Sequence, residues 1–218
     1  MRAIIKAYIL SALALGLWLV PQSQARAQSA AFDFYVFALS WSPGFCALEG
    51  QDKGRDQCAS GARQRFVVHG LWPQAEAQSA IDCPAGQRPI PRAILDGARD
   101  LFPSEGLARY QWRKHGGCSG VAPSVWFDHV RRAKAGVNLP PDLLALQAEA
   151  RFEPEEILRK FRDVNPGLRP GMAAISCPRE IFQEIRLCMS ADLRDFVACP
   201  QIMRQSCRAR AISVKAPL

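Results

Sequence analysis

Histidine is scarce in this chain, and no apolar run is as long as the roughly 20 residues that span a bilayer. Only three histidines occur in 218 residues, and no two of the eight cysteines are spaced C-x-x-C. This pattern does not favour a structural zinc site, and the lack of any internal repeat excludes collagen-like and coiled-coil folds. What is present, 49% hydrophobic and 22% charged residues, is typical of a folded globular chain.

The first residues have the pattern of an export signal. Arg2 and Lys6 precede an apolar run over residues 7–20, followed by a polar stretch that ends in the small-x-small signal ARA. The alternative is a membrane anchor, but this run is shorter than the roughly 20 residues that span a bilayer. We therefore predict a signal peptide over residues 1–27 and a single periplasmic or secreted domain over residues 28–218, without a membrane contact.

The chain is basic, with a formal net charge of +8. Three of its 28 basic residues lie in the predicted signal peptide, so 25 basic and 20 acidic residues, a net charge of +5, remain after cleavage. Such an excess favours a polyanionic partner. Many basic surfaces bind nothing in particular, so charge alone does not assign a partner.

All the cysteines follow the predicted signal peptide. Their even number in an exported chain predicts four disulfides, and the sequence pattern leaves their pairing open. They are Cys46, Cys58, Cys83, Cys118, Cys177, Cys188, Cys199 and Cys207.

Hydrophobic patterning predicts strands near both ends of the domain and helices between them. Strands are expected over residues 32–40, over 65–69 (where Gly70 and Pro73 would stop the strand), and over 173–177 and 181–188. Helices are expected over residues 91–102, 105–115 with Ser104 as N-cap, 124–135 with Ser124 as cap, 141–150 and 155–163. A loop is expected over 50–61 and an irregular excursion over 75–91. This order predicts an α+β fold.

Two of the histidines lie in segments suited to chemistry on RNA. Cleavage of RNA without a metal needs one group that takes the proton of the ribose 2′-OH and one that protonates the departing 5′ oxygen. Histidine suits both tasks near neutral pH, and a cation must stabilise the charge that builds on phosphorus.

His69 is followed by Gly70, which permits close approach of a ligand, and by Trp72, on which a base can stack. The alternative for His69 is a structural histidine beside a core tryptophan.

The second histidine segment lies at the end of the helix expected over residues 105–115. Gln111 is one helical turn before His115 and Lys114 is adjacent to it, so all three side chains can converge on one ligand. The alternative is a solvated face whose cations complement the helix dipole. His129 lies outside both segments, and we expect a structural or surface role for it.

Four segments resemble the ribonuclease T2 family. They are LSWSPGFC at 39–46, FVVHGLWP at 66–73, WRKHGGC at 112–118 and IRLC at 185–188. The resemblance extends over nearly all of the domain. It implies an α+β fold with a central antiparallel sheet, and metal-independent cleavage of single-stranded RNA through a 2′,3′-cyclic phosphate, with low base preference and no cofactor. It leaves the oligomeric state open, and a monomer is the default expectation.

The resemblance also implies roles for individual residues. His115 would be the general base, His69 the general acid, and Lys114 the cation that stabilises the transition state. Trp72 would line a base site, and Gln74 would tune base preference. The disulfide pairing implied by the family is Cys46–Cys58, Cys83–Cys118, Cys177–Cys207 and Cys188–Cys199.

Two positions depart from the family pattern, which usually opens the second segment with His-Glu-Trp. Tyr110 replaces a histidine that helps to bind phosphate, so it keeps a hydrogen-bond donor but brings no cation. Gln111 replaces a carboxylate that assists the transition state, so it keeps hydrogen bonding but loses the charge. We expect an active enzyme, and the competing hypothesis is a ribonuclease-shaped RNA-binding protein that has lost turnover.

Overall fold

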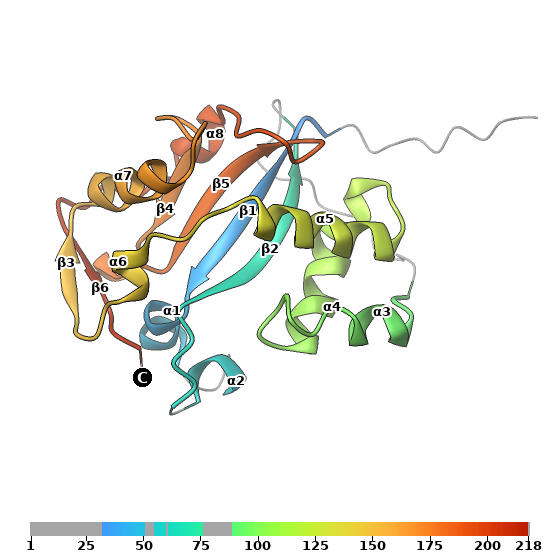
Figure 1. Ribbon diagram of the computed structural model, residues 1–218, viewed down its shortest axis with the longest axis horizontal. Helices are drawn as coiled ribbons and strands as arrows, with labels where there is room; N and C mark the ends of the chain where they lie inside the picture. Colours follow the sequence, from blue (N-terminus) through green and yellow to red (C-terminus); the bar gives the residue numbers. More distant parts are fainter. Residues whose placement is uncertain (1–31, 51–54, 60, 76–88, 218) are drawn as a thin grey trace, which may run out of the picture.

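A four-stranded antiparallel sheet runs through the centre of the computed structural model (Figure 1). Its strands lie in the order β2 (Phe66–Gln74), β1 (Phe34–Trp41), β5 (Glu184–Ser190), β4 (Ala173–Ser176). A separate two-stranded sheet pairs β3 (Ala150–Phe152) with β6 (Ile212–Val214). The structure describes residues 32–50, 55–59, 61–75 and 89–217, with the backbone alone at 55 and 56.

Strand β1 is buried on both faces, as its nearly continuous apolar sequence predicts. Its odd-numbered residues, among them Tyr35 and Phe37, face the main hydrophobic core, while Phe34 and Val36 face a smaller apolar cluster. This alternation follows from the two-residue repeat of a strand. The sheet therefore has a large helix-covered face and a second face with a small cluster.

The helices divide between these two faces. The main core receives side chains from α3 (Arg92–Asp96), α4 (Glu105–Lys114), α5 (Pro123–Ala135) and α7 (Pro154–Val164). Ile202 of α8 (Pro200–Met203) packs into the smaller cluster on the other face. The remaining helical turns are α1 (Ser42–Glu49), α2 (Arg55–Cys58), α6 (Pro141–Leu144), η1 (Gly116–Ser119) and η2 (Pro178–Glu180).

Strand β2 corrects the prediction that Gly70 and Pro73 stop the strand at His69. Its pairing with β1 joins Ala38 to Gly70 and then Leu39 to Val68, so His69 is the extra residue of a β-bulge and the strand continues to Gln74. Pro73 is tolerated within β2 because this strand is at the edge of the sheet, where a residue without a backbone N–H need not break a hydrogen bond to a second neighbouring strand.

Other element boundaries were predicted with mixed success. Helix α4 is confirmed with Ser104 as N-cap, whose Oγ accepts a 3.2 Å hydrogen bond from Leu107 N. Ser124 is not a cap, because α5 already begins at Pro123, a residue suited to a first helical position. Helix α3 ends at Asp96 instead of residue 102, and the predicted 50–61 loop contains α2.

The helix predicted over 141–150 and the strand predicted over 181–188 are also corrected. Helix α6 ends at Leu144 and is followed by β3, whose partner β6 lies some 60 residues later, so no local pattern marks this pair. Strand β5 begins at Glu184 because Phe182 N bonds to Ser213 O outside the central sheet. Residues 42–49 form α1, with Pro43 in its first turn. Proline is tolerated there because the N–H that it lacks would have no partner within the helix.

The disulfide pairing implied by the family is confirmed at three bridges, Cys46–Cys58, Cys177–Cys207 and Cys188–Cys199. Cys118 is also disulfide-bonded, but its expected partner Cys83 lies outside the described residues. The predicted signal peptide and most of the 75–91 excursion lie outside them too. In the described part of the chain, no helix is long and apolar enough to cross a membrane.

Candidate active site

The bulge in β2 turns His69 toward the sheet face that carries the smaller apolar cluster. There its Nδ1 is hydrogen-bonded to Oε2 of Glu184 on β5. The His69 side chain keeps 38% of its surface exposed, whereas that of Glu184 keeps 5%. One edge of the imidazole is therefore anchored to the sheet, and the ring still reaches solvent.

Trp72 brings the two predicted active-site segments together. Its ring centroid lies 5.3 Å from that of His69, at an interplanar angle of 86°. It also lies 5.3 Å from the ring of His115, at 37°. The two imidazoles, which are 46 residues apart in the sequence, therefore both contact the same indole ring.

Gln111 fixes the indole in this position. It is buried, at 1% exposure, and its Oε1 accepts a 2.8 Å hydrogen bond from Trp72 Nε1. A Cβ on Gly70 would collide with both Trp72 Nε1 and Gln111 Oε1. Gly70 was predicted to leave room for a ligand, and the structure gives it another task, which is to leave room for this hydrogen bond.

The end of α4 presents the remaining residues of the second segment. Lys114 is its exposed last residue, Tyr110 is 47% exposed one turn earlier, and the backbone N–H of His115 bonds to Gln111 O at 2.9 Å. Gly116, which follows His115, is buried, and a Cβ there would collide with the ring of Trp112. Close packing of α4 against the core therefore sets where His115 lies.

Glu184 and Arg186 belong to the site although the sequence patterns did not select them as site residues. Arg186 Nε donates a 2.7 Å hydrogen bond to Glu184 Oε1, and its guanidinium carbon lies 5.5 Å from the centroid of the Trp72 ring. Burial by itself raises the pKa of Glu184, but the hydrogen bond from His69 and the charges of His69 and Arg186 hold that pKa below its ordinary value. A signal was available, since a glutamate within the mostly apolar strand expected over residues 181–188 needs a partner when it is buried.

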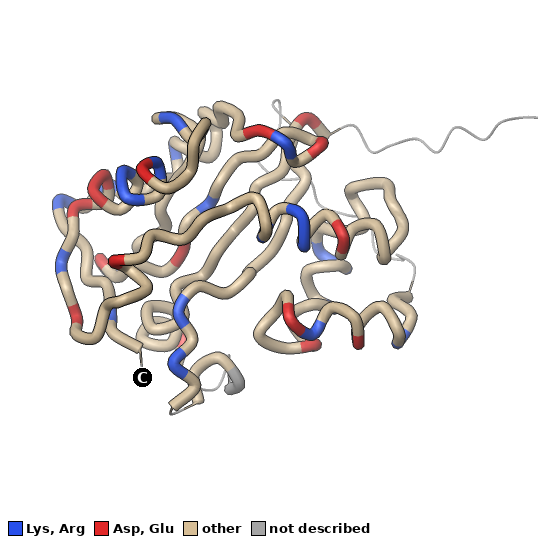
Figure 2. The backbone as a smooth tube through the Cα atoms, viewed as in Figure 1, with Lys and Arg blue, Asp and Glu red and all other residues tan. Residues whose placement is uncertain are grey.

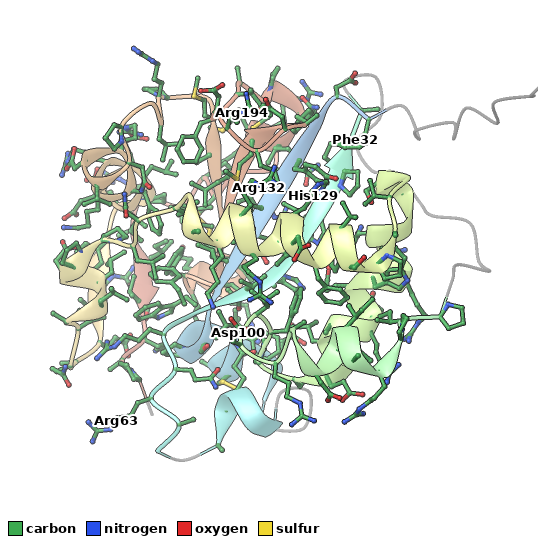
Figure 3. All side chains as sticks on the ribbon, turned by 45° about the vertical axis from the view of Figure 1, so that its right-hand side comes forward. Phe32, Arg63, Asp100, His129, Arg132 and Arg194 are labelled. Carbon is green, nitrogen blue, oxygen red and sulfur yellow. A yellow bond between two sulfur atoms is a disulfide. The ribbon has the colours of Figure 1, made fainter. Side chains whose placement is uncertain are left out.

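Two further predicted residues lie apart from this contact group. Gln74 ends β2 at 4% exposure, and its Nε2 donates a 2.8 Å bond to Pro73 O. His129 lies on α5, where Nδ1 is 3.3 Å from the hydroxyl of Tyr35, a residue of the main core. Figure 3 shows His129 beside Phe32 over the start of β1, so this histidine is on the helix-covered face and away from the other two.

Acidic and basic residues are interspersed along the backbone in Figure 2, and α7 carries residues of both signs. Within the described ranges, no group of three histidine, cysteine, aspartate or glutamate side chains is placed to hold a metal ion.

The sequence profile of the ribonuclease T2 family matches residues 32–199, which include every element of the site. The chain belongs to the ribonuclease T2 family. A ribonuclease of Aeromonas hydrophila is 38% identical over 122 residues, which cover 54% of this chain and 52% of the relative. Ribonuclease I of Escherichia coli K12 is 30% identical over 168 residues, 56% of this chain and 62% of the relative. This T2-family chain thus spans about half the length of the Aeromonas relative.

Solved structures confirm the predicted T2-like α+β fold. An RNase-related protein from Calystegia sepium has a TM-score of 0.65 at 19% identity, covering 85% of this chain and 97% of its own. RNase NT in complex with 5′-AMP has a TM-score of 0.64 at 19% identity, and the match covers 86% of this chain and 98% of RNase NT. At such identities the likeness establishes the common fold alone.

Proposed function

We propose that this T2-family chain is an endoribonuclease that cleaves single-stranded RNA without a metal ion or other cofactor. The observation that carries the proposal is the shared contact of His69 and His115 with Trp72. Transesterification of RNA needs one group that removes a proton and one that supplies a proton, and two imidazoles on one indole meet this need.

In the first step His115 removes the proton from the ribose 2′-OH, and the 2′ oxygen forms a bond to phosphorus. The bond between phosphorus and the 5′ oxygen breaks, and His69 gives that oxygen a proton. The products are a 2′,3′-cyclic phosphate and a free 5′-OH. In the second step His69 removes a proton from water, and the water oxygen forms a bond to phosphorus. The bond between phosphorus and the 2′ oxygen breaks, His115 returns a proton to that oxygen, and a 3′-phosphate end beside a free 2′-OH results.

The other residues of the second segment bind and stabilise. The ammonium of Lys114 stabilises the charge that builds on the phosphate oxygens. The exposed hydroxyl of Tyr110 donates a hydrogen bond to a phosphate oxygen in place of a cation. Trp72 is half-buried and offers its remaining surface to a base, and stacking of this kind tolerates every base. Gln74 tunes that preference from the end of β2.

The decisive experiment incubates the purified domain with single-stranded RNA in excess EDTA. We expect cleavage into fragments with cyclic phosphate and then 3′-phosphate ends, resistance of DNA, and a bell-shaped pH dependence. His69→Ala and His115→Ala should each lower kcat/KM by about 100- to 10,000-fold. His129→Gln is the matched control and should cleave like the parent, since His129 lies on the other face of the sheet.

A second function is favoured by one specific observation, namely that Tyr110 and Gln111 lack the charges of the family pattern. In that case the chain would be a T2-fold RNA-binding protein without turnover. It would bind RNA with an affinity that falls as the salt concentration rises, and it would release no cleavage product in the same EDTA assay. Parent-like cleavage by both His69→Ala and His115→Ala would contradict the proposed mechanism itself.

We propose export to the periplasm or the exterior, with cleavage of the leader after Ala27. The disulfides support this location, because such bonds persist in oxidising compartments. All residues of the proposed site come from one chain, so a monomer suffices for activity. Sequencing the N-terminus of the exported protein tests the cleavage position, and a start other than residue 28 would contradict it.

A further inference from the structure

Glu184 is a buried carboxylate on the proposed reaction face, and it is bonded to two side chains, those of His69 and Arg186. It stands on β5 between Ile185, which faces the main core, and Gln183. Oε2 meets His69 Nδ1 and Oε1 meets Arg186 Nε at 2.7 Å. Both carboxylate oxygens are therefore engaged, one by the imidazole and one by the guanidinium.

We infer that Glu184 is the positioning residue of His69, holding the imidazole with Nδ1–H toward β5 and Nε2 toward the RNA. Because a neutral imidazole carries one proton, a carboxylate at Nδ1 selects the tautomer whose Nε2 is free to exchange a proton with substrate. The inference rests on the proposed function, since it assigns a partner to the group that protonates the leaving oxygen.

Arg186 stabilises the charged form of Glu184. A lone carboxylate at 4% exposure would favour its neutral form, which holds an imidazolium less strongly. Arg186, whose side chain remains 26% exposed, supplies the opposite charge, and its Nη1 in turn donates a 3.3 Å hydrogen bond to Gln205 Oε1. Around His69, the charged groups are Glu184 and Arg186 from β5, with His115 across Trp72 at the end of α4 and Lys114 preceding it in the chain.

The test compares two substrates that differ in their need for an acid. Uridylyl-(3′,5′)-adenosine releases a 5′ alkoxide, which must be protonated, while uridine 3′-(4-nitrophenyl phosphate) releases a stable phenolate. We expect Glu184→Gln to lower kcat/KM about tenfold or more on the first substrate and by less than about threefold on the second. The alkaline limb of the pH profile should move to lower pH, because the imidazolium loses an anionic neighbour.

Glu149→Gln is the matched control. Glu149 also joins two partners, Ser213 and Lys215, and its loss changes the net charge equally, but it lies beside the β3–β6 sheet. Its kcat/KM values and its alkaline limb should equal those of the parent. Equal losses on both substrates in a folded Glu184→Gln, with an unmoved alkaline limb, would overturn the inference.

The same substrates separate this inference from the proposed function. If His69→Ala also loses activity equally on both substrates, then His69 is not the acid and the proposed mechanism fails. If His69→Ala shows the leaving-group dependence and folded Glu184→Gln does not, only the role of Glu184 fails.

A measurement on the parent protein covers the case in which Glu184→Gln does not fold. Imidazole nitrogen resonances, with His69 assigned through His69→Ala, report which ring nitrogen of the neutral form is protonated. We expect the proton on Nδ1. A neutral His69 protonated on Nε2 would overturn the inference irrespective of any variant.

Discussion

The indole N–H of Trp72 donates a 2.8 Å hydrogen bond to the side-chain oxygen of Gln111, and this bond joins the edge strand to α4. His115 is one helical turn after Gln111, and His69 is three residues before Trp72. The two proposed proton-transfer residues are thus connected through one partly buried hydrogen bond. Disturbing it should change their separation before it unfolds the protein.

Gly70→Ala tests this connection sterically. The new Cβ would collide with both members of the Trp72–Gln111 pair, so the indole must move or the bond must break. We expect a loss of about 1–3 kcal/mol in the free energy of unfolding and a larger fractional loss of kcat/KM. Urea denaturation and RNA cleavage measure the two effects.

Gly106→Ala is its control, since a Cβ at this α4 position would have only Ser104 Oγ nearby, at 3.8 Å. The control should be as stable as the parent or more stable by up to about 1 kcal/mol, with parent-like cleavage. A Gly70→Ala variant as stable and active as this control would contradict the packing argument.

Changes at Gln111 separate its hydrogen bond from its missing charge. Gln111→Ala leaves the Trp72 N–H without its acceptor and should cost about 1–3 kcal/mol in unfolding free energy, with reduced cleavage. Gln111→Glu retains an acceptor and restores the family's negative charge. We expect a higher kcat/KM than in the parent, and an unchanged or lower value would mean that the amide is no defect in this protein.

The Cys188–Cys199 disulfide supports the reaction face. It packs with Val36 and Ile202 in the small cluster that also contacts Trp72. Replacing both cysteines by serine should lower the free energy of unfolding by about 3 kcal/mol and reduce cleavage even where the variant is folded.

Removing Cys46–Cys58 is the matched comparison, because its separation of 12 residues is close to the 11 of Cys188–Cys199. It closes the α1–α2 region, so the folded variant should cleave like the parent despite a similar loss of stability. Equal cleavage by the two folded variants would argue against a specific support of the site.

His129 should make stability depend on pH. Burial, followed by the charge of Arg132, lowers the pKa of His129, so the folded state prefers the neutral ring. The unfolded state binds a proton more readily, and stability present above about pH 6.5 is lost as pH falls below it. In urea denaturation at pH 7 and pH 5, His129→Gln should lose less stability on acidification than the parent; an equal loss would contradict this role.

Some features of the site were predictable from local sequence. The segments around His69 and His115 each contain a histidine beside glycine. Gln111 and Lys114 share a helix whose N-cap, Ser104, was identified correctly and whose C-cap is His115. Local patterns sufficed there because helix caps and helical spacing depend on neighbouring residues. The role of Gly70 could not be predicted, since its neighbours Trp72 Nε1 and Gln111 Oε1 meet only in the folded chain.

Glu184 is the clearest feature that local sequence did not reveal. Its partner His69 is 115 residues away, and the contact requires β1 to lie between β2 and β5 and a bulge to turn the imidazole. The same holds for β3 and β6, which are short and lie far apart in the sequence. Strand pairing is non-local, so propensity in a short window does not specify it.

The amino-acid sequence by itself determined the α+β class, the family and the residue types that the proposed chemistry needs, because these depend on composition and on short contiguous motifs. The tertiary structure decided which of these residues meet. Burial of alternate faces of the central strands brought Trp72 between two distant histidines and placed a carboxylate, Glu184, behind one of them.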